Sequence, residues 1–329
     1  MRFANDSSLS LACCRMCPRQ CRTDRTAGET GFCGAGAIPT VARIMLHRWE
    51  EPCISGRDPD RGSGAVFFCH CSLGCIYCQN RTISGAVPGN GRAMTEAALA
   101  DAFLRLQEAG AYNINLVTPT HYTAQIADAL EKARAMGLIL PVVWNTGGYE
   151  SADTIRSLAG LVDVYLTDFK YADPTLAKQL SRAEDYPVRA AQALDVMFRT
   201  AGPVRLDGEG MLTGGVIVRH LVLPGFRKDS IAVLRQIAET VPPDRIRLSL
   251  MRQYTPAFLA ESCPPDRPGT EEIPRSLYRR VTSFEYQSVL EEAVRLGFEG
   301  YTQEGDSAVK KFTPDFTGDW AIPTAPPAF

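Results

Sequence analysis

Four of the chain's eleven cysteines stand close together in the segment CHCSLGCIYCQN, residues 69 to 80. Three of them have the spacing Cys71-x3-Cys75-x2-Cys78 and offer three thiolates from one loop. A closed structural zinc site or an ordinary ferredoxin cluster takes four protein ligands. With three ligands, one iron of a [4Fe–4S] cluster keeps an open coordination position. The spacing therefore indicates a cluster that binds a small molecule at its open iron.

A second set of cysteines lies near the N-terminus, where Cys14, Cys17, Cys21 and Cys33 offer four more thiolates. Four thiolates close a metal site, and a metal would stabilise a segment that has little apolar sequence of its own. Zinc and a second [4Fe–4S] cluster both accept such ligands, so both stay open. Neighbouring arginines would stabilise an anionic cluster and favour iron–sulfur slightly; they are Arg15, Arg19, Arg22 and Arg25.

The composition excludes several classes of protein. The chain has 329 residues, and its 35 basic against 37 acidic side chains give no basic field for nucleic acid. The first residues lack the pattern of a secretory signal, and no run approaches the roughly 18 apolar residues of a membrane span. We therefore expect a cytoplasmic protein with no membrane partner. Disulfides rarely persist in the cytoplasm, so the clustered cysteines indicate metal chemistry.

Six short apolar runs alternate with amphipathic stretches, and they are AVFF (65–68), NINLVTP (113–119), PVVWNTG (141–147), DVYLTDF (163–169), GVIVRHLVLPG (215–225) and RIRLSLM (245–251). Runs that are apolar on both faces predict the buried strands of a parallel sheet. The stretches 95–110 and 123–137 predict helices, whose inward residues are Ala98, Phe103, Leu104 and Leu106, then Ile126, Ala129, Leu130 and Ala133.

Six such units fit either an open doubly wound sheet or a partial barrel, and periodicity does not choose between them. Ligands bind at the carboxyl ends of the strands in both architectures, so the cysteine loop after the first strand lies where a site is expected. We divide the chain into a cysteine-rich N-terminal extension (1–60), a core (61–260) and a C-terminal helical extension (261–329) with one clear helix at 283–297 and a flexible tail.

The cysteine loop, with the aromatic Tyr77 before its last cysteine, resembles the cluster loop of radical S-adenosylmethionine (SAM) enzymes. The chain is most similar to the pyruvate formate-lyase activating enzyme-like branch of these proteins. The similar segments cover most of the chain and are CRMCPRQC (14–21), AGETGFCGAG (27–36), YCQN (77–80), NLVTPTH (115–121), WNTGGY (144–149), TDFKYAD (167–173), VRHLVLPG (218–225) and LMRQYTP (250–256). The resemblance implies an α/β fold, a partial (β/α)6 TIM-like barrel with extensions at both ends.

The resemblance also implies a chemistry. The open iron of a [4Fe–4S] cluster would bind SAM, and an electron from a donor such as flavodoxin or ferredoxin would cleave the sulfonium to methionine and a 5′-deoxyadenosyl radical. The radical would abstract a hydrogen atom from a protein or small molecule that the residues do not identify. The name of the branch implies a glycyl radical enzyme as the partner. The alternative is an iron–sulfur or zinc adaptor or electron-transfer protein without SAM chemistry, which would have no use for an open iron.

The chain departs from the family pattern just before the first ligand, where relatives usually carry a small residue and Gly. This chain has Cys69 and His70 there. Cys71 keeps the family spacing and is the expected ligand, together with Cys75 and Cys78. Cys69 should point to the opposite side of the strand and pack as a small buried side chain.

Other residues expected to contact the cofactor lie in the cysteine loop and at later strand ends, and they are Tyr77, Thr118, Thr120, Asn145, Thr146, Asp168, Lys170 and Arg219. Asp168 and Lys170 are two residues apart, so a plain internal ion pair is an equal alternative. Arg219 sits in an apolar run and needs a carboxylate partner, which the cofactor or substrate could supply. For His121, a functional role and none at all stay equally open.

Overall fold

The computed structural model describes residues 7–85, 91–265, 272–303, 314–316 and 320–323. Six parallel strands form the centre of its sheet: β2 (Gly62–Phe68), β4 (Ala111–Val117), β5 (Val142–Thr146), β6 (Val164–Asp168), β8 (Leu212–Leu221) and β9 (Arg247–Met251). These are the six strands predicted from the apolar runs. The predicted parallel sheet is confirmed.

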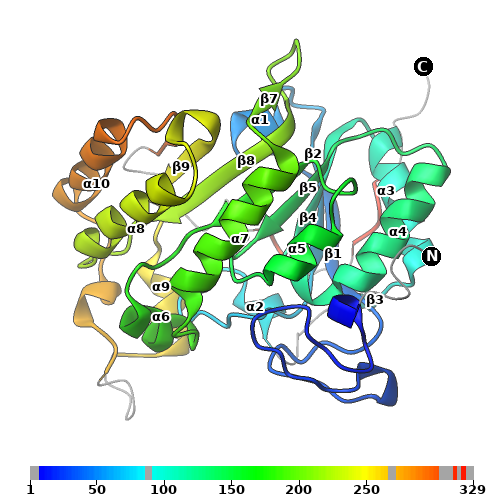
Figure 1. Ribbon diagram of the computed structural model, residues 1–329, viewed down its shortest axis with the longest axis horizontal. Helices are drawn as coiled ribbons and strands as arrows, with labels where there is room; N and C mark the ends of the chain where they lie inside the picture. Colours follow the sequence, from blue (N-terminus) through cyan, green and yellow to red (C-terminus); the bar gives the residue numbers. More distant parts are fainter. Residues whose placement is uncertain (1–6, 86–90, 266–271, 304–313, 317–319, 324–329) are drawn as a thin grey trace.

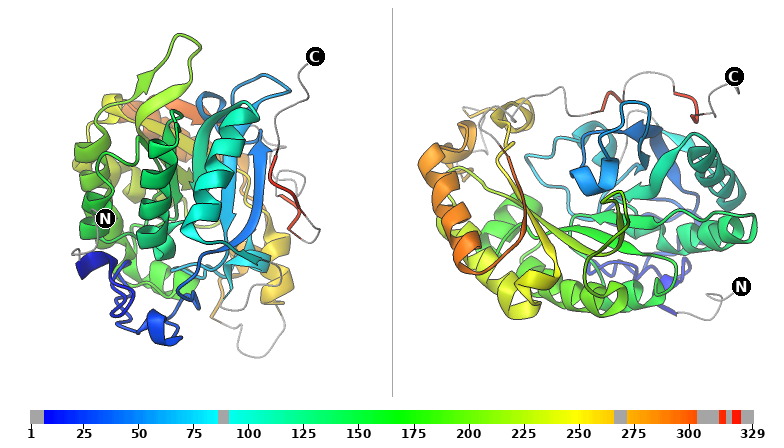
Figure 2. Two further views of the ribbon diagram at one scale, coloured as in Figure 1. Left: turned by 90° about the vertical axis from the view of Figure 1, so that its right-hand side faces the viewer. Right: turned by 90° about the horizontal axis from the view of Figure 1, so that it is seen from above.

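Four further strands extend this sheet: β10 (Gly300–Thr302), β1 (Thr40–His47), β3 (Arg92–Ala93) and β7 (Arg205–Leu206). The strand order is β10-β9-β8-β6-β5-β4-β2-β1-β3, and β7 pairs with β8. The two ends of this order do not pair with each other, so the curved sheet is an open, partial barrel (Figures 1 and 2).

Helices cover the outer face of the curved sheet, as the view from above shows (Figure 2). The helices of the described residues, of which α1 lies on the concave face instead, are α1 (Pro52–Ser55), α2 (Arg81–Ser84), α3 (Glu96–Glu108), α4 (Thr123–Ala135), α5 (Ala152–Ser157), α6 (Pro174–Ser181), α7 (Tyr186–Ala201), α8 (Arg227–Thr240), α9 (Pro256–Ser262) and α10 (Ser283–Arg295). No helix in the described part of the chain is long and apolar enough to cross a membrane.

The helices predicted at 95–110 and 123–137 are α3 and α4. The four expected inward residues of α4 are buried, as are Phe103 and Leu106 of α3. Ala98 and Leu104 are only partly buried, and Leu99 completes the buried face of α3. Helix α10 matches the prediction at 283–297 and begins with a capping box, because Thr282 and Glu285 bond each other's backbone N–H.

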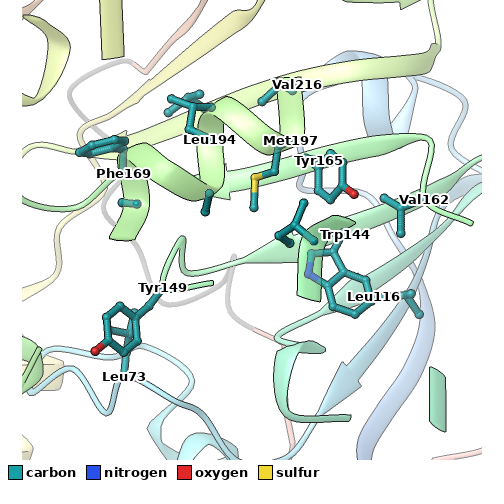
Figure 3. Packing of buried hydrophobic residues seen from close by; sticks show 14 of the residues in the cluster. Leu73, Leu116, Trp144, Tyr149, Val162, Tyr165, Phe169, Leu194, Met197 and Val216 are labelled. Atoms are coloured by element: carbon teal, nitrogen blue, oxygen red, sulfur yellow. The ribbon is translucent and has the colours of Figure 1, made fainter. Parts of the chain in front are cut away.

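Side chains of the strands pack on both faces of the sheet. Trp144 and Tyr165 lie in the outer core with Met197 of α7 (Figure 3). Leu166, next to Tyr165, belongs to a second cluster with Ile54 of α1, on the concave face. A sheet buried on both faces explains why its strands read as continuous apolar runs.

Residues 40–47, within the predicted N-terminal extension (1–60), form β1 and pair with β2 in antiparallel register. The division of the chain near residues 60 and 260 stays a prediction. The end of the expected flexible tail, residues 324–329, lies outside the described residues.

Candidate active site

A cavity of about 230 Å³ opens at the carboxyl ends of the parallel strands. Cys71, Cys75 and Cys78 of the loop after β2 line one side of it. Residues at the ends of the later strands line the rest, and those predicted from sequence are Thr118, Asn145, Thr146, Asp168, Lys170 and Arg219. Tyr77 also lines the cavity. The strand order thus brings nearly all the predicted site residues to one place.

The cysteine loop turns through two residues with positive φ, His70 at 74° and Gly74 at 67°. The His70 Nδ1 atom lies 3.1 Å from the Cys33 carbonyl oxygen, which ties the loop to the N-terminal segment. Positive φ is unusual for a residue other than glycine, so the surrounding contacts must stabilise His70 in this conformation.

Hydroxyl groups approach two of the three thiols in the loop. Ser181 Oγ donates to Cys75 Sγ over 2.9 Å, and Ser84 Oγ lies 3.6 Å from Cys78 Sγ. Burial, reinforced by the neighbouring Cys75 thiol, raises the pKa of the Cys71 thiol to about 12. A coordinated cation removes the protons of such thiols. Three soft donors on the wall of one cavity suit an iron–sulfur cluster.

Cys69 is fully buried and packs with Phe67 and Ile83, away from the cluster that contacts Cys71. The expectation that Cys69 points to the opposite side is confirmed. Strand β2 ends at Phe68, and the positive φ of His70 turns the chain between Cys69 and Cys71, which explains why the first and second cysteines of the segment face different surroundings.

The charged pair at the end of β6 forms the internal ion pair considered from sequence. Lys170 Nζ lies 2.5 Å from Asp168 Oδ2, and both side chains are about one-fifth exposed. Burial alone would lower the pKa of Lys170, but the Asp168 carboxylate together with the neighbouring Cys75, Tyr77 and Tyr186 holds that pKa well above its ordinary value. Both residues also line the cavity.

The carboxylate partners of Arg219 come from the chain itself. Arg219 Nε donates to Glu51 Oε1 over 2.8 Å, and Arg219 Nη2 donates to both Glu50 and Glu51. Glu50 in turn accepts from Asn115 and Asn145 over 3.2 and 3.3 Å. The need for a partner was predicted, but its source was not, because Glu50 and Glu51 lie far from Arg219 in sequence. A cofactor contact of Arg219 stays a prediction.

Two predicted hydroxyl groups share a buried carboxylate that the sequence analysis missed. Thr120 Oγ1 donates to Glu150 Oε1 over 2.5 Å, and Thr146 Oγ1 donates to the same oxygen. Burial raises the pKa of Glu150 to about 7, although both hydrogen bonds lower it. Thr120 does not line the cavity, so its hydroxyl serves Glu150. The only sequence signal was an acidic residue closing the turn after β5.

Thr118 at the end of β4 has φ of 58° and lines the cavity. A β-branched residue in this region is a conformational outlier that only surrounding contacts can maintain. One such contact is the hydrogen bond from the Thr118 N–H to the Asn145 carbonyl, at 2.8 Å. These contacts hold the strained backbone of Thr118 at the point where the chain turns past the cavity.

The N-terminal segment, dark blue in Figure 1, lies at the same end of the molecule as α2, which directly follows the cysteine loop. Cys14, Cys17, Cys21 and Cys33 line a second, small cavity of about 10 Å³ together with His121. In the described part of the chain, no three Cys, His, Asp or Glu side chains are positioned to hold a metal ion, which applies equally to this set and to the cysteine loop.

Arg19 joins the N-terminal segment to the cysteine loop. Its guanidinium donates to the carbonyls of Ser72 and Ser181 over 2.9 and 3.0 Å, and to Arg182 over 2.5 Å. The same group stacks over the Phe32 ring at 3.8 Å. One side chain therefore fixes the cysteine loop, the end of α6 and the N-terminal segment relative to one another.

Comparisons with known proteins show the family of the chain. The family model described as the Radical SAM superfamily matches residues 66–236. The uncharacterized protein MJ0674 of Methanocaldococcus jannaschii is 27% identical over 292 residues, which cover 84% of this chain and 73% of that protein.

Two solved structures have related folds at low identity. Streptococcus suis SuiB bound to the precursor peptide SuiA has a TM-score of 0.48 and 12% identity over 72% of this chain and 47% of SuiB. A radical SAM methyltransferase from Sphaerobacter thermophilus has a TM-score of 0.45 and 16% identity, covering 75% of this chain and 67% of the methyltransferase. The chain thus spans about half the length of SuiB.

Proposed function

The chain belongs to the radical SAM superfamily, whose members use a [4Fe–4S] cluster and SAM, and from this premise we propose that it cleaves SAM reductively to start a hydrogen-atom abstraction. The observation that carries the proposal is the cavity of about 230 Å³ on which three cysteines of one loop meet the polar ends of the parallel strands. When bound, the cluster supplies the electron that breaks the sulfonium bond and releases a 5′-deoxyadenosyl radical.

In this proposal Cys71, Cys75 and Cys78 would hold the cluster, and one of its irons would keep an open position for SAM. The hydrogen bond from Ser181 to Cys75 stabilises negative charge on that sulfur. Tyr77 is buried and bonds Tyr171 through its hydroxyl at 2.6 Å, so it holds the loop in place.

The protein groups around the cavity would orient the amino acid part of SAM. The Asp168–Lys170 pair offers one charge of each sign, which matches a zwitterion. Asn145, Thr146 and the strained backbone at Thr118 add hydrogen-bonding groups on the same wall. Cavity walls that exclude water protect a reactive radical from side reactions.

The finer parts of the function are also proposals. The enzyme would act in the cytoplasm as an oxidoreductase of the pyruvate formate-lyase activating enzyme-like type and take electrons from flavodoxin or ferredoxin. Its hydrogen donor would be a protein or a small molecule, with a glycyl radical enzyme as one such protein. The four N-terminal thiols would hold a second metal, which is supported by their position on one small cavity.

Formation of 5′-deoxyadenosine by the anaerobically reconstituted, reduced protein tests the central proposal. We expect the wild type and Cys69→Ala to form it, because Cys69 packs away from the cavity. Cys71→Ala should form none and should lose most of the visible absorbance of the cluster. If the wild-type protein holds its cluster but forms no 5′-deoxyadenosine, the proposal is refuted and the alternative of an electron-transfer adaptor is favoured. Activity in Cys71→Ala with loss in Cys69→Ala would show that the first ligand is misassigned.

A further inference from the structure

The size of the N-terminal cavity limits what can occupy it. Its volume is about 10 Å³, close to the space that one water molecule needs. A single metal ion could be accommodated by small movements of the side chains, whereas a cluster of four irons and four sulfides would require a much larger displacement. The larger cavity beside the cysteine loop has about 230 Å³ and has room for a cluster. The two cysteine sets therefore differ in the kind of metal centre that they can accommodate.

A histidine from the barrel also lines the small cavity. His121 lies in the turn after β4 and is only 2% exposed. Its Nε2 atom lies 2.7 Å from the Cys69 carbonyl oxygen, which can only accept a hydrogen bond, so Nε2 carries the proton. The other ring nitrogen, Nδ1, then has a free lone pair. Among the described residues, Nδ1 has no hydrogen-bond partner although it is buried.

This arrangement is the one that metal-binding histidines use. Such a residue donates one ring N–H to a carbonyl or carboxylate, which fixes the tautomer, and coordinates through the other nitrogen. A buried nitrogen lone pair without a partner is otherwise costly, because folding removes its hydrogen bond to water. Coordination of a metal would satisfy the Nδ1 lone pair of His121.

Backbone N–H groups reach two of the four thiols. The backbone N–H of Phe32 donates to Cys21 Sγ over 3.3 Å, and that of Ala35 donates to Cys33 Sγ over 3.5 Å. Such bonds stabilise a thiolate more than a thiol. Gly31 is required beside Cys21, because a Cβ atom at residue 31 would lie 2.6 Å from Cys21 Sγ.

We infer that the small cavity is a mononuclear Zn²⁺ site in which His121 Nδ1 coordinates the metal together with three of the cysteines Cys14, Cys17, Cys21 and Cys33. A tetrahedral Cys₃His set is common for structural zinc. The inference rests on the second metal of the proposed function and identifies both the ion and a ligand from the barrel. The side chains close around the ion on binding, so the metal ties the N-terminal segment to the end of β4.

The test uses the full chain with Cys71, Cys75 and Cys78 all changed to Ala, purified without oxygen and analysed for metals. We expect about one zinc per chain and no iron. About four irons per chain would instead show a second cubane and overturn the inference. A folded variant without metal would overturn it as well.

A histidine substitution in the same background tests the ligand from the barrel. His121→Asn should weaken Zn²⁺ binding about tenfold or more in competition with a chromophoric chelator. In the Co²⁺-loaded protein it should also shift the visible bands. The matched control is His47→Asn, because His47 is likewise buried with an unpartnered Nδ1 but does not line the cavity. Equal affinities in the two variants would show that His121 is not a ligand.

These outcomes are separable from those of the proposed function, which is read from 5′-deoxyadenosine formation by the chain with its cysteine loop intact. If the protein binds zinc but makes no 5′-deoxyadenosine, the proposed radical chemistry is refuted and the inference of a zinc site stands. If the protein cleaves SAM but binds no zinc, the zinc site is refuted and the proposed function stands.

Discussion

Replacing Ser181 by alanine should lower the reduction potential of a cluster bound at Cys75. Ser181 is fully buried at the end of α6, and its hydroxyl proton goes to Cys75 Sγ. Ser181 has a single hydroxyl proton and gives it to Cys75, so it can only accept from Tyr171, which donates to Ser181 Oγ over 2.7 Å. By the same reasoning Tyr77 donates to the Tyr171 hydroxyl over 2.6 Å. Three hydroxyl dipoles therefore point toward one sulfur and reinforce one another.

The magnitude follows from the strength of a hydrogen bond to a charged group, which is about 1.5–3 kcal/mol. Reduction adds one electron to the cluster, so the bond to the sulfur is stronger in the reduced state. A difference of about 1 kcal/mol between the two states corresponds to about 40 mV for one electron. Ser181→Ala should therefore lower the potential by about this amount, and Tyr171→Phe by less, because it only weakens the relay.

The assay is an anaerobic redox titration followed by the EPR signal of the reduced cluster, with iron content measured on the same samples. Ser84→Ala is the matched control, because the Ser84 hydroxyl lies 3.6 Å from Cys78 Sγ and should matter less than the 2.9 Å bond of Ser181. An unchanged or higher potential in Ser181→Ala with full iron content would refute the reasoning. Equal shifts in the two serine variants would refute it too.

Four other substitutions test separate parts of the site. Asp168→Asn should weaken SAM binding about tenfold, seen when SAM is titrated into the EPR signal, without loss of iron. Glu150 has its pKa raised from 4.5 to about 7, so the folded state holds its proton and stability falls as pH rises between these values. In urea unfolding, the wild type should lose roughly 3 kcal/mol relative to Glu150→Gln across this window, because the buried histidines titrate alike in both proteins and cancel in the difference. Arg19→Gln should release iron from the cysteine loop faster in air, measured as bleaching of the visible absorbance. Arg219→Leu should cost about 3–5 kcal/mol in urea unfolding, because two carboxylates are left buried and unpaired.

The parallel core of the fold could be predicted because a sheet covered on both faces leaves its pattern in each strand separately. Trp144 faces the outer core, and its apolar neighbour Val143 lies in the inner cluster, so the run is apolar at consecutive positions. Strand β1 gave no such pattern. Several of its residues, Arg43 among them, are only partly buried, and its place is fixed by pairing with β2.

The three cysteines of the loop could be predicted because their spacing is local. The groups that surround them could not, because their partners are distant in sequence. Ser181 lies 106 residues from Cys75, and Glu51 lies 168 residues from Arg219. The role of His121 depends on its tautomer, which the carbonyl of Cys69 fixes only in the folded chain.

Helix α1 fills one end of the barrel. This helix lies inside the curve of the sheet (Figure 2), where Ile54 packs on Leu166 and Ile217. The adjoining Glu50 and Glu51 bond Arg219. Together with the packing of Ile54, these contacts close the amino end of the barrel with residues of the chain itself. In the proposed function, SAM would therefore approach from the carboxyl ends of the strands, where the cavity of about 230 Å³ lies.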